Sequence, residues 1–90
     1  MSTDKVPVEK RQSAIQKILK GISTFEKLVK DEESESRINC ADVLNGLDKI
    51  RERLSVEPTP SSKTIMIENS ELDNARYYLC YLYSNSLNNA

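Results

Sequence analysis

The sequence predicts an all-α protein, specifically a small antiparallel three-helix bundle. Three segments carry apolar residues at alternating spacings of three and four, which is typical of amphipathic helices. Two glycines and three prolines in 90 residues are too few for the many tight turns of a small β-sandwich or barrel. The composition, 38% apolar and 30% charged, fits a compact domain rather than a solvated coil. We therefore expect one helical domain over residues 1–90 with a small core.

The first helix is expected at about residues 7–30, in a segment that begins at residue 4. Thr3 or Asp4 can cap it, and Pro7 is tolerated in the first turn, where an amide hydrogen has no partner. Its apolar stripe consists of Val8, Ile15, Ile18, Ile22, Phe25 and Val29, with Leu19 flanking. The opposite face carries Lys10, Lys17, Lys20, Thr24 and Lys27. We interpret that face as solvated surface first and as a docking surface for acidic partners second.

Residues 31–38 are expected to form an acidic loop, because four acids follow one another closely there. They are Asp31, Glu32, Glu33 and Glu35. The second helix follows at residues 39–55, with Asn39 and Asp42 forming a variant capping box. Its stripe consists of Cys40, Val43, Leu47, Ile50 and Leu54, with Leu44 flanking.

Asn45-Gly46 conflicts with this second helix, because the dipeptide is typical of a type I′ β-hairpin. Glycine inside a helix also costs about 1 kcal/mol relative to alanine. The apolar stripe continues across the dipeptide, so the helix is the preferred interpretation. Gly46, like Gly21, is then either a close approach between helices or a weak spot.

Residues 56–69 are expected to be an exposed Pro/Ser linker, since Pro58 and Pro60 each remove a donor and restrict the preceding residue. The β-branched run Thr64–Ile67 leaves alternatives open: extended chain, the lead-in to the third helix, or a short extra turn at 63–68. The third helix is expected at residues 70–86, in a segment ending at residue 87. Ser70 with Asp73 resembles a capping box at its start.

The third helix is apolar on more than one side, which suggests a face for a partner. Leu72, Ala75, Leu79, Leu82, Tyr83 and Ser86 share one face, and Tyr77 and Tyr81 point nearly opposite, alongside Asn74 and Ser84. The candidate partner-binding residues are Tyr77, Tyr81, Tyr78, Asn74, Asp73 and Ser84. In the alternative interpretation, Tyr77 and Tyr81 cover the seam between the first two helices at the edge of the core.

Catalytic, metal and cofactor sites are not expected. The chain has no histidine, which removes the commonest general base and metal ligand. Its two isolated glycines cannot form a phosphate-binding loop, and the acidic cluster lacks the pattern of a calcium loop. Cys40 and Cys80 are interpreted as reduced core thiols. We expect a protein that is not an enzyme.

The favoured function is a non-catalytic protein-protein interaction or assembly module. Self-association through the Tyr-rich third helix is a special case, since pairing two small bundles buries more apolar surface. Binding of a lipid surface or a small apolar ligand is an alternative, although the polar side of this helix is not basic. A net charge of -1 argues against nucleic acid as partner. Without a signal or membrane-length apolar run, the expected location is intracellular, cytoplasmic or nuclear.

Two families offer a resemblance. The segments from Ala14 to Leu19 and from Phe25 to Val29, followed by Leu47-Asp48-Lys49-Ile50, resemble the first two helices of BAG domains, which are co-chaperone bundles. The resemblance covers about half of the chain and implies a helical bundle. The third helix of that family carries a basic cluster, whereas here only Arg76 stands among the tyrosines, so the activity is not carried over. Small bacteriocin immunity proteins are similar in size and in their aromatic late helices.

Overall fold

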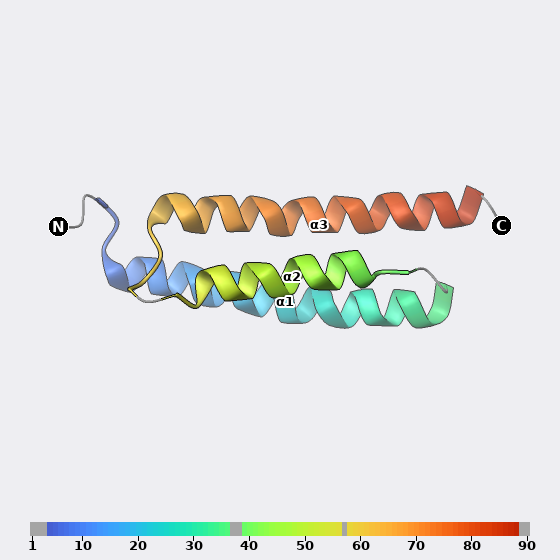
Figure 1. The fold of residues 1–90 in the computed structure, drawn as a ribbon, viewed down its shortest axis with the longest axis horizontal. Coiled ribbons are helices and arrows are strands. Elements are labelled where there is room, and N and C mark those ends of the chain that lie inside the picture. Colours follow the sequence, from blue (N-terminus) through green and yellow to red (C-terminus); the bar gives the residue numbers. More distant parts are fainter. Residues whose placement is uncertain (1–3, 37–38, 57, 89–90) are drawn as a thin grey trace.

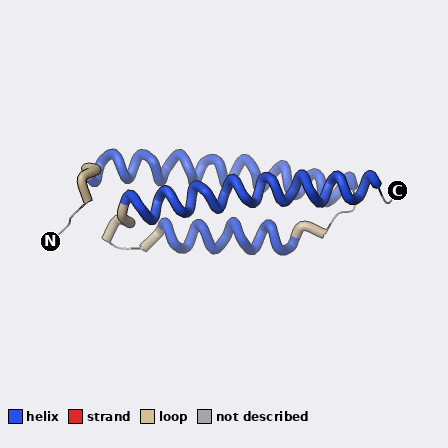
Figure 2. Tube along the Cα trace, turned by 90° about the horizontal axis from the view of Figure 1, so that it is seen from above, coloured by secondary structure: helices blue, strands red, loops and turns tan. Residues whose placement is uncertain are grey.

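The computed structural model describes residues 4–36, 39–56 and 58–88 and consists of three antiparallel helices packed side by side (Figure 1). They are α1 (Val8–Ser36), α2 (Ala41–Leu54) and α3 (Ser62–Asn88). The predicted all-α bundle is confirmed, and the described residues contain no strand. Asn45-Gly46 lies inside α2, so a hairpin there is excluded. The bundle measures 55 × 17 × 16 Å, and α2 is visibly the shortest helix (Figure 2).

The core forms where the helical stripes meet along the bundle axis. Its buried apolar residues are Ile15, Ile18, Ile22, Phe25 and Val29 from α1, Cys40, Val43, Leu47, Ile50 and Leu54 around α2, and Ile65, Leu72 and Leu79 from α3. The stripes predicted for the first two helices are therefore confirmed, apart from Val8, which is 47% exposed. Arg11 is buried in its place, one turn further along α1.

The acidic segment after residue 30 is helical, so the predicted loop at 31–38 is wrong as far as Ser36. Glu33 instead accepts a hydrogen bond on Oε2 from the Cys40 amide at 2.9 Å, just before α2. A carboxylate at this position also stabilises the positive end of the α2 dipole. Cys40 is the N-cap residue, whereas the Asn39 side chain accepts from the Ala41 amide at 3.0 Å. Asn39 therefore accepts the first α2 amide, as predicted, and the second acceptor at this helix start is Glu33 of α1 rather than Asp42.

Helix α3 begins at Ser62, eight residues earlier than predicted, so most of the expected 56–69 linker is helix. The Ser61 carbonyl accepts from the Ile65 amide at 3.0 Å, and the Ser61 hydroxyl accepts from the Thr64 amide at 3.2 Å. A serine that accepts from the third helical amide is an effective N-cap. Of the alternatives for the 63–68 segment, the lead-in to the third helix is confirmed, because the segment is the first part of α3. Ser70, the predicted cap, lies in the helix interior.

Asp4 caps α3 rather than α1. Its carboxylate accepts from the Ser62 amide at 2.6 Å and from the Ser62 hydroxyl at 2.9 Å, across 58 residues of sequence. The first turn of α1 is instead closed by the Pro7 carbonyl, which accepts from the Arg11 amide at 3.0 Å. Thr3, the other predicted cap, lies outside the described residues. Asp4 therefore ties the start of the chain to the start of α3.

Arg11 completes this junction. It is 7% exposed, and its Nε donates to the Val6 carbonyl at 3.1 Å. Its Nη1 donates to the Thr59 and Pro60 carbonyls at 3.2 and 3.0 Å, and Nε lies 3.8 Å from the Asp4 carboxylate. We call Asp4, Arg11 and Ser62 the N-terminal clasp. The clasp holds the connection between α2 and α3 against α1.

The clasp makes stability depend on pH through Asp4. Hydrogen bonds from the Ser62 and Val6 amides, then the Ser62 hydroxyl and the Arg11 charge, hold the pKa of Asp4 below its ordinary value of 3.8. Because the folded pKa is the lower one, this stabilisation is present above about pH 4 and is lost as pH falls through the folded value. We expect the unfolding free energy of Asp4→Asn to change less than that of wild type between about pH 5 and 2. Urea unfolding at a series of pH values checks this, and equal changes would contradict it.

Two further ion pairs join α2 to α1 and to α3. Arg51 on α2 binds both carboxylate oxygens of Glu26 on α1 at 2.7 Å, which holds the pKa of Glu26 below its ordinary value. Arg53 on α2 binds Glu68 on α3 at 2.9 Å. Glu68 is only 2% exposed, so this contact balances a charge inside the bundle.

Candidate protein-binding surface

The outer face of α3 presents aromatic side chains to solvent near the end of the bundle. Tyr77 is 75% exposed, Tyr81 61% and Tyr78 42%. All six predicted partner-binding residues are exposed on this helix. They are Asp73, Asn74, Tyr77, Tyr78, Tyr81 and Ser84, and we call this group the tyrosine surface.

The register of α3 produces this surface. Leu72 and Leu79 are buried against the other helices, and Tyr77 and Tyr81 lie on the opposite side, about one turn apart. The interpretation in which these two rings cover the seam of the first two helices does not fit their exposure. The rings of Tyr78 and Tyr81 stack with centroids 6.4 Å apart and an interplanar angle of 14°. Two of the three aromatic side chains are thus already ordered against each other.

The tyrosine surface carries almost no charge. From Tyr77 to Ala90 the sequence contains no charged residue. At the other edge, Asp73 forms an ion pair with Arg76 on the same helix at 2.9 Å. Tyr83, predicted on the buried face, is 41% exposed and so extends the aromatic character of this part of α3. Ser86 was predicted on the same buried face, but its side chain is not among those that the structure describes.

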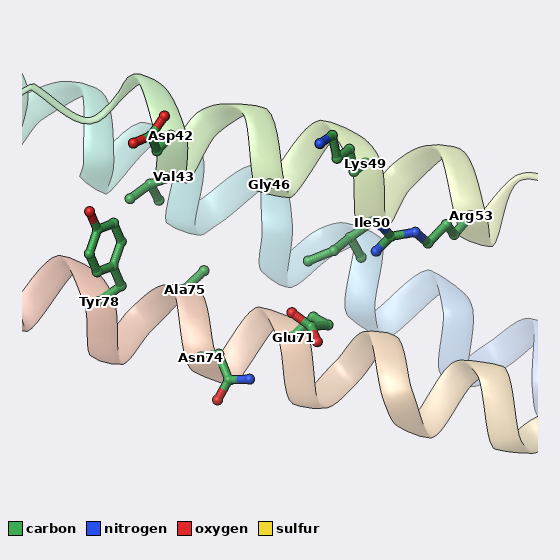
Figure 3. Close-up of a pocket in the computed structure, with 10 residues that line it drawn as sticks. All are labelled: Asp42, Val43, Gly46, Lys49, Ile50, Arg53, Glu71, Asn74, Ala75 and Tyr78. Atoms are coloured by element: carbon green, nitrogen blue, oxygen red, sulfur yellow. The ribbon is translucent and has the colours of Figure 1, made fainter.

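A hollow between α2 and α3 borders the tyrosine surface (Figure 3). The Tyr78 ring points from α3 toward Val43 and forms one wall, whereas Asn74 points away from α2 (Figure 3). The hollow exists because α2 carries Gly46 where a side chain would fill the space, and a Cβ there would meet no atom within 4 Å. Its rim is charged, with Asp42, Lys49, Arg53 and Glu71. A charged rim does not suit an apolar small molecule.

The two glycines therefore differ. A Cβ on Gly21 would lie 3.5 Å from the Leu72 side chain and 3.4 Å from Nη2 of Arg76, so Gly21 marks a close approach of α1 to α3. Gly46 makes no such approach. Of the two alternatives predicted for it, a close approach between helices or a weak spot in the helix, the weak spot therefore applies.

The two cysteines also differ, and the prediction that both are core thiols is correct only for Cys40. Burial raises the pKa of the Cys40 thiol, and the charges of Glu33 and Glu32 raise it further. This thiol is therefore a poor nucleophile. Cys80 is exposed, because it follows buried Leu79 by one residue and so points about 100° away from the core.

The described ranges hold no group of three side chains able to bind a metal ion. None of their helices is long and apolar enough to cross a membrane. What α3 offers chemically is a surface of aromatic rings with hydroxyl tips, which suits binding by contact and hydrogen bonds.

Comparison with protein-family models, with curated proteins and with solved structures gives no match for this chain.

Proposed function

We propose that this chain is a non-catalytic protein-interaction module and that the tyrosine surface is its binding site. One observation carries the proposal: Tyr77 and Tyr81 leave 75% and 61% of their area in solvent on a segment without charge. Tyrosine combines large area, few rotatable bonds and a polar tip, and is enriched among residues that dominate binding energy. The rest of the domain acts as a rigid support for this helix.

The uncharged character of the surface defines the chemistry of the partner. Charged groups lose their hydration on entering an interface and need opposite charges there in return. The tyrosine surface offers hydroxyl and amide groups from Tyr77, Tyr81 and Asn74, but no such charges beyond the Asp73–Arg76 pair. We therefore propose a protein partner that presents an apolar, largely uncharged surface, such as one face of an amphipathic helix.

Affinity capture from the source cell tests the proposal, with wild type compared to Tyr77→Ala plus Tyr81→Ala. Two lost aromatic anchors at about 2 kcal/mol each are expected to reduce the captured partner at least tenfold. The matched control is Met66→Ala plus Ile67→Ala, which removes two side chains of 66% and 49% exposure from the same helix outside the tyrosine surface. Equal capture by wild type and the tyrosine variant contradicts the proposal.

A further inference from the structure

The outer face of α1 carries a second surface, with a charge pattern that is complementary to itself. Six exposed residues follow one another along it, and we call them the α1 stripe. They are Lys17, Lys20, Thr24, Leu28, Asp31 and Glu35. Lys17 and Glu35 are about five helical turns apart and lie at nearly the same angle around the helix. The stripe therefore runs almost parallel to the helix axis.

Charge is divided along this stripe. Lys17 and Lys20 lie at one end, Asp31 and Glu35 at the other, and the centre is uncharged. None of these four forms an ion pair with another residue in the part of the chain that the structure describes. Their charges are thus available to a partner that carries the reverse order.

The centre of the stripe carries an exposed apolar side chain next to a hollow with charged residues in its lining. Leu28 is 51% exposed, although it is a large aliphatic side chain. Beside it, Gly21, Thr24 and Phe25 line an open hollow between α1 and α3, and the cations of Lys17, Lys20, Lys27 and Arg76 line the same hollow. A protruding apolar residue next to a hollow is the arrangement that a two-fold contact requires, since each copy must supply both parts.

We propose that a second copy of this chain pairs with the α1 stripe in antiparallel orientation, around a two-fold axis near residue 26. In this register Lys17 faces Glu35 of the partner subunit, and Lys20 faces Asp31 of the partner subunit. Leu28 lies over the hollow beside Thr24 of the partner subunit. The two-fold axis repeats each of these contacts, which gives four ion pairs around Leu28 and the partner subunit's Leu28.

Charge selects this orientation. In a parallel pair the lysines would face the same lysines of the other copy, and the acids would face the same acids. The antiparallel contact extends over about 27 Å of helix, from residue 17 to residue 35. Lys27 and Arg76 are cations beside the centre of the contact, and Arg76 is already paired with Asp73 on its own helix.

The pairing leaves the tyrosine side chains of the proposed binding surface out of the contact. The α1 stripe and the tyrosine surface lie on different helices and meet at one hollow, which Leu28 and Ser84 both line. The paired register uses none of Tyr77, Tyr78 and Tyr81. Two binding surfaces on one particle raise the apparent affinity for a partner that itself has two sites, without any new contact. The inferred dimer is thus a bivalent form of the proposed module.

Sedimentation equilibrium of charge-reversal variants of the 90-residue chain tests this inference. Lys17→Glu plus Lys20→Glu makes the stripe wholly acidic, and Asp31→Lys plus Glu35→Lys makes it wholly basic. Each variant alone is expected to dimerise at least tenfold more weakly than wild type. An equimolar mixture of the two is expected to regain dimerisation as a heterodimer, because all four ion pairs are then restored in reversed sense. Wild-type dimerisation is expected to weaken as salt rises.

The control is Lys49→Glu plus Lys63→Glu, which makes the same change in charge at exposed positions on α2 and α3 and is expected to dimerise like wild type. Three results would each overturn the inference: a monomeric wild type up to millimolar protein, reversal variants that dimerise as wild type does, or a mixture that stays monomeric. The tyrosine double variant should also dimerise normally. If only the tyrosine double variant loses the dimer, the two copies associate through α3 and not through the α1 stripe. The second copy would then be the partner that binds the tyrosine surface.

Discussion

Replacement of Arg11 by alanine is expected to lower the free energy of unfolding by about 3–5 kcal/mol. The substitution removes a guanidinium that is 7% exposed and donates to the carbonyls of Val6, Thr59 and Pro60. Those acceptors then lose a charged donor, and the neighbouring Asp4 carboxylate loses its cation. A small domain has only about 5–15 kcal/mol in total, so much of its stability depends on this one side chain.

Urea unfolding followed by circular dichroism measures this effect, with Lys10→Ala as the matched control. Lys10 precedes Arg11 in the same helical turn but is exposed, so its replacement is expected to change stability by less than about 0.5 kcal/mol. If Arg11→Ala and Lys10→Ala unfold at the same urea concentration, the N-terminal clasp does not hold the bundle together.

The second large effect is expected from proline at position 71. Glu71 lies in the interior of α3, nine residues after its start, where proline removes a hydrogen bond and clashes with the preceding turn. We expect Glu71→Pro to destabilise the domain by about 3 kcal/mol or more. If α3 instead began at Ser70, residue 71 would be the first helical position, where proline is tolerated. The substitution thus distinguishes the observed start of α3 from the one that the sequence suggests.

Thermal unfolding compares this variant with Glu71→Ala, which changes the same exposed side chain but keeps the backbone hydrogen bond. The alanine variant should unfold within a few degrees of wild type, and the proline variant should unfold far below it. A proline variant as stable as the alanine variant would mean that the segment before residue 70 is not helical.

The first two helices could be predicted because their signal is local. Apolar residues recur every three or four positions, and each stripe is complete within its own segment. The start of α3 could not be predicted in the same way, since part of its cap comes from Asp4, 58 residues away. Its stripe from Ile65 to Leu72 also passes through Glu68, a charge that is buried only because Arg53 pairs with it. A charged residue in this register interrupts the apolar pattern.

The candidate site, too, could be predicted from the sequence only in part. The angle of about 100° per residue placed Tyr77 and Tyr81 opposite the buried face of the third helix, and their exposure agrees. The role of Arg11 was missed because the stripe predicted for the first helix was drawn from apolar residues alone. Its spacing of four residues before Ile15 puts it on the apolar stripe, and a charge in that register was the available signal. The end of α1 was missed because the acidic residues after position 30 were interpreted as a loop. The contact that uses one of them, the hydrogen bond from the Cys40 amide to Glu33, joins α1 to the start of α2 and leaves no signal in the local sequence.

The free energy of unfolding of Tyr77→Ala plus Tyr81→Ala, measured by urea titration, tests most directly whether these rings are free to bind a partner. Because both side chains are more than half exposed, we expect a change of less than about 1 kcal/mol. A loss of several kcal/mol would contradict it, since the tyrosines would then belong to the core and not to a surface for another protein.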